Sequence, residues 1–519
     1  MNISKFSLFF FLMVFVFCSC HKKEDFVCVS LNDFDSLRTA GYDVSADNVF
    51  SNIRALMGSD TTNSIADIHA RRHYRKDMDM LWITRDGVSS NADTLLTFIQ
   101  RVDSFGFSRE KFYYSMLKED LQRVRVLDFD SLESSRNTAD KVFARLEYYL
   151  TKAFLRYTEG QRFGFMNPFQ AFNRLDKRNE DTVHVSYRSL YGWNTSLPGS
   201  NYLATACSVI KGDGEKFTDF LAKSKPHNPL YNKYVAELNK TNDKAYRRLL
   251  LCNMERCRWE NDSDYPQLHK KYVVVNVPAL HLYAHDGDER LVMKVAVGTF
   301  KTKTPLLHSK IKRMDFNPQW IIPKSIIKTS IVPHVGDHAY FDRHNYFVRE
   351  RSTGKIVEPE NVTREMLLSA NYSVVQWGGR GNALGRLIFR FDNDYSIYMH
   401  DTSSPGVFAR TNRMVSHGCI RVEKPYDLAV FMLKDKDEAL MEKIKYSMAA
   451  DFSERPREYE TTDERPKRSE MVRSLKVDPL VPVYITYYTL YPDAAGNLVR
   501  HEDIYGFDGI IYENIQKYL

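Results

Sequence analysis

Apolar side chains repeat with two different periods, and the change falls near residue 270. Upstream, four segments repeat their apolar residues at the helical period of about 3.6 residues: 91–105, 139–157, 216–223 and 244–259. In the second of these segments, Val142, Phe143, Leu146 and Leu150 fall on one face. Residues 26 to about 250 are therefore predicted to be mainly helical and to pack around that face.

Downstream, apolar and branched residues alternate in short runs, as in half-buried strands. Strands are expected at 272–277, 281–284 and 291–297, and a second hairpin pairs 387–391 with 395–400. Lys424-Pro425 opens a helix that reaches Leu433, since proline is favoured in a first helical turn. The predicted fold class is α+β, with a helical N-terminal part followed by a mainly β domain.

The N-terminus has the features of a secretion signal. Lys5 precedes an apolar run from Leu8 to Phe17, which is too short to span a bilayer. Cys18-Ser19-Cys20 resembles a bacterial lipobox, in which Cys20 would carry the lipid. We therefore predict a signal peptide at 1–19, a tether at 20–45 and a membrane-anchored lipoprotein. An ordinary cleaved signal and an uncleaved anchor are the alternatives.

Composition bears on the number of domains, on the class of partner and on metal or cofactor binding. A length of 519 residues predicts two or three domains, and 43% hydrophobic with 27% charged residues is ordinary for folded protein. The net charge of +7 is spread among interspersed acids and bases, which disfavours a nucleic-acid partner. The seven cysteines form no Cys-x-x-Cys pattern, so neither a metal site nor a cofactor is expected.

One short motif carries candidate chemistry. In Ser416-His417-Gly418-Cys419-Ile420-Arg421 the cysteine lies nineteen residues after His400. A thiolate is the reactive form of cysteine, and an imidazole can take the thiol proton and later protonate a leaving amine. Gly418 lets backbone approach a carbonyl, so the N–H groups of Gly418 and Cys419 are expected to stabilise an oxyanion.

This motif resembles the active site of the L,D-transpeptidase catalytic domain, the YkuD-type fold. Residues 376–386, 298–305 and 317–323 resemble other segments of the family, as do 482–487 and 503–506, which resemble its closing strands. Gly378 stands where the family usually has proline, which predicts a looser loop. The helical part resembles the scaffold of the YcbB-type subgroup. The resemblance implies that the nucleophile is Cys419 and the base is His400. It also places five residues in the pocket and oxyanion region: Ser416, His417, Gly418, Arg421 and Asp401. Asp401 would act through its backbone carbonyl.

The resemblance also implies a domain order and a reaction. We expect a helical scaffold at 46–265 and a catalytic domain at 266–519, with a capping insert at about 324–373 that acts as a lid. The substrates would be peptidoglycan tetrapeptide stems in the periplasm of a Gram-negative bacterium. A Cys419 thioester formed with loss of D-Ala would be resolved by a neighbouring stem to give a 3–3 cross-link, and carbapenems would acylate the same thiol.

Other functions remain open from the sequence. Water as acceptor would make the protein an L,D-carboxypeptidase, and an outer-membrane protein or a D-amino acid could replace the second stem. A non-catalytic, wall-binding lipoprotein is the alternative from another class. A papain-like protease is disfavoured because His400 precedes Cys419 in the chain.

Overall fold

A computed structural model describes residues 38–39, 42–76, 79–84, 87–178, 185–259, 264–450 and 466–519. The predicted signal peptide, Cys20 and most of the predicted tether lie outside these ranges. The chain forms two compact units, the first from residues up to 99 with 113–155 and 199–223, and the second from 100–112, 156–198 and 224–519. The sequence boundary expected at residue 265 stays a prediction.

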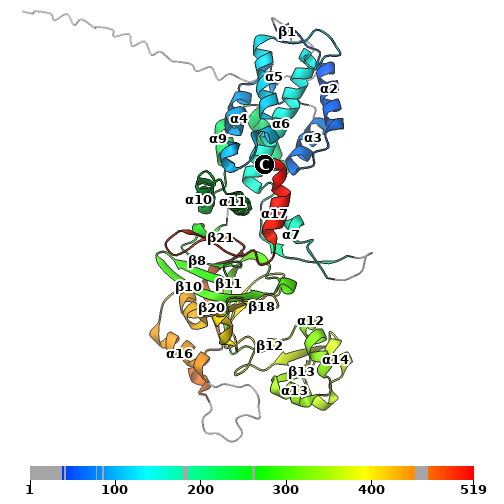
Figure 1. The fold of residues 1–519 in the computed structure, drawn as a ribbon. Coiled ribbons are helices and arrows are strands. Elements are labelled where there is room, and N and C mark those ends of the chain that lie inside the picture. Colours follow the sequence, from blue (N-terminus) through cyan, green and yellow to red (C-terminus); the bar gives the residue numbers. More distant parts are fainter. Residues whose placement is uncertain are drawn as a thin grey trace, which may run out of the picture. The chain divides into compact units, whose positions relative to one another are not determined.

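The first unit is helical, as the apolar period predicts (Figure 1). A buried carboxylate organises it: Glu147 accepts hydrogen bonds from the backbone N–H groups of Leu81, Trp82 and Ile83. Those donors would otherwise be buried without partners. The unit contains the first part of α6 (Ala139–Phe163) together with α2 (Ala46–Ser59), α3 (Ile65–Lys76), α4 (Asn91–Ile99), α5 (Tyr114–Val126), α8 (Ser200–Ile210) and α9 (Phe217–Lys223).

The second unit is built on a sheet that closes on itself. Its strands run in the order β16-β17-β19-β10-β9-β8-β20-β11, and β11 pairs in turn with β16. β18 (Met414–Ser416) adds to β10, and β7 (Tyr191–Gly192) adds to the start of β11. The strands of the ring are β8 (Lys271–Asn276), β9 (His281–Asp286), β10 (Glu289–Gly298), β11 (Leu306–Phe316), β16 (Leu387–Phe391), β17 (Met399–His400), β19 (Ile420–Val422) and β20 (Ser474–Thr486).

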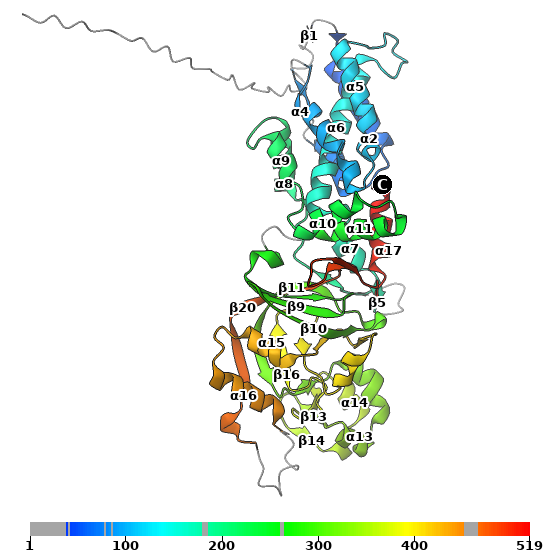
Figure 2. The same cartoon turned by 60° about the vertical axis from the view of Figure 1, so that its left-hand side comes forward.

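Helices cover this sheet from two sides. In Figures 1 and 2 α10 and α11 lie on one side of β8 and β9, and α16 lies on the other. Arg256 of α11 forms an ion pair of 2.6 Å with Asp508 of α17, which lets charged groups be buried there. These helices span Pro229–Leu238 (α10), Lys244–Cys257 (α11), Pro425–Met432 (α15), Glu438–Ala449 (α16) and Phe507–Ile515 (α17).

The insert folds around a core of its own. Its antiparallel sheet has the order β12-β15-β13-β14, formed by Trp320–Ile321, Tyr372–Gln376, Tyr346–Glu350 and Ile356–Val357 respectively. Buried residues such as Ile327, Phe341 and Leu367 fill the space between this sheet and its short helices. The α+β fold class with an inserted subdomain is thus confirmed.

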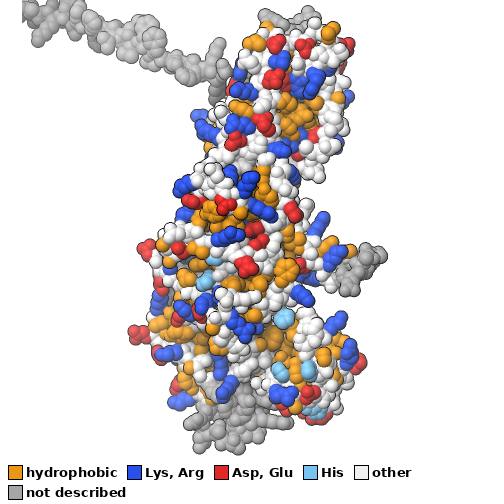
Figure 3. Space-filling model, in the orientation of Figure 1, with side chains coloured by type: hydrophobic (Ala, Val, Ile, Leu, Met, Phe, Trp, Pro, Cys, Tyr) orange, Lys and Arg blue, Asp and Glu red, His pale blue; other side chains and the backbone are white. Residues whose placement is uncertain are grey.

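Over the visible face, acidic and basic side chains are interspersed (Figure 3).

Two strand predictions were wrong in detail. Residues 395–398 are not a strand, because the Asn393 side chain binds the backbone of Tyr395 and Ile397, and Ser396 has φ of 54°. Only 399–400 remain in β17. Residues 503–506 form a turn before α17 rather than a closing strand.

Candidate active site

His400 and Cys419 are brought to neighbouring strands. β17 and β19 pair in parallel with His400 opposite Arg421, and the Ile420 N–H donates to the Tyr398 carbonyl at 3.1 Å. Cys419 directly precedes β19 and His400 ends β17. The sheet register therefore gathers the predicted nucleophile, base and arginine at one place, although nineteen residues separate the first two in sequence.

The imidazole of His400 is buried and held in one tautomer. Its Nδ1 contacts the carbonyl of Asp401, and since a carbonyl only accepts, Nδ1 carries the proton. Nε2 then keeps its lone pair for a thiol proton. Burial and, to a smaller extent, the Arg421 guanidinium lower the pKa of His400 to about 4, and the carbonyls of Asp401 and Leu384 partly oppose this shift.

The pKa of the Cys419 thiol is shifted in the opposite direction from that of His400. Burial raises its pKa to about 11, whereas the Tyr398 backbone N–H and the Arg421 guanidinium favour the thiolate. With the base near 4 and the thiol near 11, the resting pair is neutral at pH 7. Proton transfer to His400 must then accompany the attack of sulfur on a carbonyl.

The turn before Cys419 is fixed by Ser416. Its hydroxyl donates to the Cys419 carbonyl at 2.6 Å and accepts from the Gly418 N–H at 3.1 Å. The prediction that the Gly418 N–H faces an oxyanion is therefore not supported, since that donor already has a partner. The Cys419 N–H has no partner among the described residues, which leaves it as the backbone donor for an oxyanion.

Asp401 acts on the neighbouring loop. Its carboxylate accepts from the Arg386 N–H at 2.8 Å, and a Cβ on Gly385 would lie 2.4 Å from the Asp401 carboxyl carbon. Burial raises the pKa of this carboxyl, and the N–H groups of Arg386 and Thr402 lower it. The side chain thus holds the 377–386 loop, while the carbonyl orients His400, as the resemblance implied.

Gly378 packs tightly in that loop. A Cβ there would lie 2.4 Å from the Asn317 carbonyl oxygen, so glycine allows a close backbone contact. The looser loop predicted from the missing proline is not supported.

Two residues that support the motif were not singled out from sequence. The Thr304 hydroxyl donates to the Gly418 carbonyl at 3.0 Å and accepts from the Gly298 N–H at 2.9 Å. The Tyr505 hydroxyl donates to the Gly298 carbonyl at 2.7 Å and accepts from the Thr304 N–H at 3.1 Å. Both lie in segments that resemble the family, which was the available signal.

A third residue near the motif, Arg188, comes from a segment far upstream in the sequence. Arg188 donates from Nη2 to the Lys303 carbonyl at 3.0 Å, and a Cβ on Gly418 would lie 3.1 Å from the same nitrogen. His417 is exposed as a residue, but its ring is partly desolvated, and this desolvation and the guanidinium groups of Arg421 and Arg188 lower its pKa. The motif therefore lies in positive surroundings.

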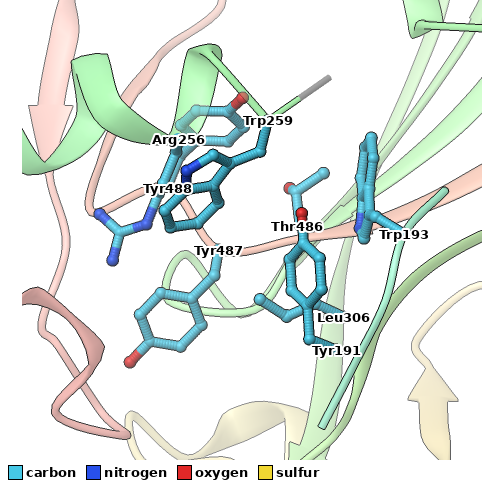
Figure 4. A pocket seen from close by; sticks show the side chains of 8 residues that line it. All are labelled: Tyr191, Trp193, Arg256, Trp259, Leu306, Thr486, Tyr487 and Tyr488. Carbon is cyan, nitrogen blue, oxygen red and sulfur yellow. The ribbon is translucent and has the colours of Figure 1, made fainter. Parts of the chain in front are cut away.

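An aromatic cavity of about 30 Å³ lies elsewhere in this unit (Figure 4). None of the predicted site residues lines it, and its volume suits one or two water molecules. Its lining is formed by Tyr191, Trp193, Arg256, Trp259, Leu306, Thr486, Tyr487 and Tyr488.

Among the described residues, no group of three or more His, Cys, Asp or Glu side chains is placed to hold a metal ion. In the same ranges no helix has the length and apolarity needed to cross a membrane.

Comparisons with known proteins agree with the site. Residues 270–444 match the family model of the L,D-transpeptidase catalytic domain (YkuD), and residues 66–238 match that of the Scaffold domain. A provisionally named L,D-transpeptidase of Haemophilus influenzae is 29% identical over 339 residues, which span 63% of this chain and 63% of the relative.

Among solved structures, an L,D-transpeptidase from Mycobacterium smegmatis is matched at 15% identity, and the match covers 31% of this chain and 53% of that one, with a TM-score of 0.18. Residues 270–444, which contain His400 and Cys419, thus match the L,D-transpeptidase catalytic domain (YkuD), and the helical region ahead of them matches the Scaffold domain.

Proposed function

We propose that the protein joins peptidoglycan stem peptides through a thioester on Cys419. The observation that carries the proposal is the placement of Cys419 beside a buried His400 whose Nδ1 is bound to the Asp401 carbonyl. This arrangement supplies a nucleophile and a base whose Nδ1 is oriented by a carbonyl, inside the region that matches the catalytic-domain model.

The reaction begins with acylation. His400 takes the Cys419 proton as sulfur attacks the carbonyl between the third residue and the terminal D-Ala of a tetrapeptide. The Cys419 N–H stabilises the oxyanion. The imidazolium then protonates the departing nitrogen, so that D-Ala leaves and a thioester remains.

The second half transfers the acyl group. The side-chain amine of a neighbouring stem's third residue attacks the thioester and gives its proton to His400. The sulfur leaves and recovers that proton from the imidazolium, which regenerates the thiol. The product is a 3–3 cross-link, and no redox change occurs.

Mass spectrometry of a purified disaccharide-tetrapeptide tests this reaction. The lipid-free protein is expected to form dimers with loss of D-Ala, and Cys419→Ala is expected to form none. Tripeptide monomer without dimer would instead assign an L,D-carboxypeptidase. Absence of any Cys419-dependent product would leave the wall-binding alternative.

Carbapenem acylation gives an independent readout of the same thiol. A strained lactam carbonyl should acylate Cys419 and add the mass of the inhibitor to the intact protein. Cys419→Ala, with Cys207 and the buried Cys252 and Cys257 still present, is the matched control. An adduct of equal yield on that variant would contradict attack by Cys419.

We further propose that the protein is a lipoprotein anchored at Cys20 and facing the periplasm. The sequence Cys18-Ser19-Cys20 after an apolar run supports this proposal. Metabolic labelling with a fatty-acid analogue should mark the wild type and not Cys20→Ser. Label that persists in the variant would contradict lipidation at this position.

A further inference from the structure

We propose that Arg188 belongs to a carboxylate-binding subsite beside Cys419, and that this subsite holds the terminal D-Ala carboxylate of the donor stem. The inference rests on the proposed transpeptidase function and names the group by which the donor is recognised. Its other members are Arg421 and His417.

Arg188 reaches the catalytic motif from a small hairpin. β6 (Tyr187–Arg188) pairs with β5 (Asp176–Lys177), and Asp176 lies opposite Arg188. The hairpin falls within the residues that match the Scaffold domain, yet it belongs to the compact unit of the closed sheet. A scaffold segment thereby contributes a side chain to the candidate active site.

The guanidinium is held by backbone and keeps unused donors. It donates to the carbonyls of Lys303 at 3.0 Å and Lys301 at 3.4 Å. A guanidinium has five N–H donors, and Arg188 has no other hydrogen bond or ion pair among the described residues. Asp176, opposite Arg188 in the hairpin, is bound by the Lys303 ammonium at 2.7 Å. Arg188 forms no direct ion pair among the described residues, although the Asp176 carboxylate acts on its charge from further away and partly offsets the lowering of its pKa by burial.

The position of this charge is next to the nucleophile. A Cβ on Gly418 would lie 3.1 Å from Arg188 Nη2, and Gly418 precedes Cys419. At φ of 116° a side chain would be strained there as well, so glycine leaves room for the guanidinium. Arg188 therefore borders the place where the scissile carbonyl must meet sulfur.

Arg421, two residues after Cys419, supplies a second guanidinium whose charge favours the thiolate. Its Nε is buried and has no hydrogen-bond partner among the described residues. An unpaired buried donor is costly, and a ligand oxygen would satisfy it. His417, which precedes Gly418 in the motif, is exposed, and the guanidinium groups of Arg421 and Arg188 both lower its pKa.

Carboxylate is the anion that this arrangement and the reaction have in common. Arginine binds planar carboxylates through paired N–H groups. In a tetrapeptide donor the free carboxylate belongs to the leaving residue itself, so it is the charged group closest to the scissile bond. In a pentapeptide it lies one residue further away, and the subsite would therefore favour tetrapeptide donors.

Binding to Cys419→Ala tests the subsite without turnover. Calorimetry would compare a tetrapeptide stem with the same peptide carrying a C-terminal carboxamide. We expect the free acid to bind about tenfold more tightly, since charge-assisted hydrogen bonds are lost in the amide. The preference should disappear in Cys419→Ala/Arg188→Gln and be partly restored with Arg188→Lys.

Arg174→Gln in the same background is the matched control. Arg174 is an exposed arginine just before the same hairpin, and that variant should keep the full preference. Equal affinity for acid and amide in the protein with Arg188, or an unchanged preference after Arg188→Gln, would overturn the inference. The two proposals can fail separately. If the preference for the free acid depends on Arg188 but the wild-type protein releases no D-Ala, the subsite stands and the proposed reaction is rejected.

Discussion

Cys419 and His400 are both buried enough to disfavour their charged forms. Burial raises the pKa of the thiol to about 11 and lowers that of the imidazole to about 4. A preformed thiolate–imidazolium pair would require the opposite order of the two pKa values. The shifted pKa values therefore favour the neutral thiol and neutral imidazole in the resting site.

The rate of acylation at acidic pH should reveal the lowered pKa of His400. Because a lowered pKa keeps the imidazole unprotonated at lower pH, the base form of His400 persists down to about pH 4. We expect kcat/KM for thioester formation to decline on the acidic side near pH 4. A pH–rate profile measured by intact mass checks this, with circular dichroism as the control for folding. A decline centred near 6.5 would contradict it.

The motif residues were predictable because their chemistry is local in sequence. Residue type and spacing singled out Cys419 and His400 as candidates, and the resemblance to the L,D-transpeptidase motif assigned them as nucleophile and base. They could not show that Ser416 occupies the Gly418 N–H, since that bond depends on the conformation of the turn. Arg188 carried no local signal, because its role comes from a hairpin far upstream.

At the scale of elements, a polar network joins the Cys419 turn to other segments. Thr304 just before β11 and Tyr505 just before α17 link Gly298 at the end of β10 to Gly418. All these bonds are buried, so each missing partner leaves an unsatisfied group. The turn is thus positioned by residues on three other parts of the chain.

Tyr505→Phe should disturb this network without changing the shape of the side chain. It removes the partner of the Thr304 N–H and of the Gly298 carbonyl, at a cost of about 1–3 kcal/mol in unfolding free energy. Acylation should slow as the turn loses its support. Denaturant unfolding and carbapenem acylation rates measure both effects.

Tyr512→Phe is the matched control on α17. Its hydroxyl has no hydrogen bond among the described residues, so stability and acylation should stay unchanged. Equal behaviour of the two variants would show that the Tyr505 hydroxyl does not support the motif.

Helices and longer strands followed from the apolar period. The exceptions arose where side chains compete for backbone groups, as Asn393 does at the segment predicted to extend β17. The tight contact of Gly378 could likewise not be predicted from the sequence, because it involves the Asn317 carbonyl from a distant segment. Local patterns do not contain such contacts.

At the scale of the whole molecule, the two compact units have separate stabilising centres. In the first, Glu147 is fully buried and receives three backbone N–H groups and the Tyr74 hydroxyl. The catalytic motif lies in the second unit. The division into helical and β parts was predictable, but not which upstream segments join the β part.

Glu147→Ala should therefore destabilise the first unit selectively. Leaving its buried donors without partners should cost about 3–5 kcal/mol there. Hydrogen exchange is expected to increase in residues 79–84 and 139–155, while β17 and β19 keep their protection. Carbapenem acylation of Cys419 should continue.

Glu119→Ala removes an exposed glutamate from α5 and serves as the control. It should leave exchange unchanged in both units. Faster exchange in β17 and β19 after Glu147→Ala would show that the units are not energetically separate.

The edge strand β7 and the β5–β6 hairpin restrict how this protein can evolve. Both are encoded upstream of residue 200, yet they complete the sheet and the surroundings of a cysteine encoded after residue 400. Recombination that joined a foreign gene segment at residue 266 would remove Tyr191, Arg188 and α11 together. The scaffold and catalytic coding regions should consequently be inherited as one block, with lineages exchanging them only as a pair.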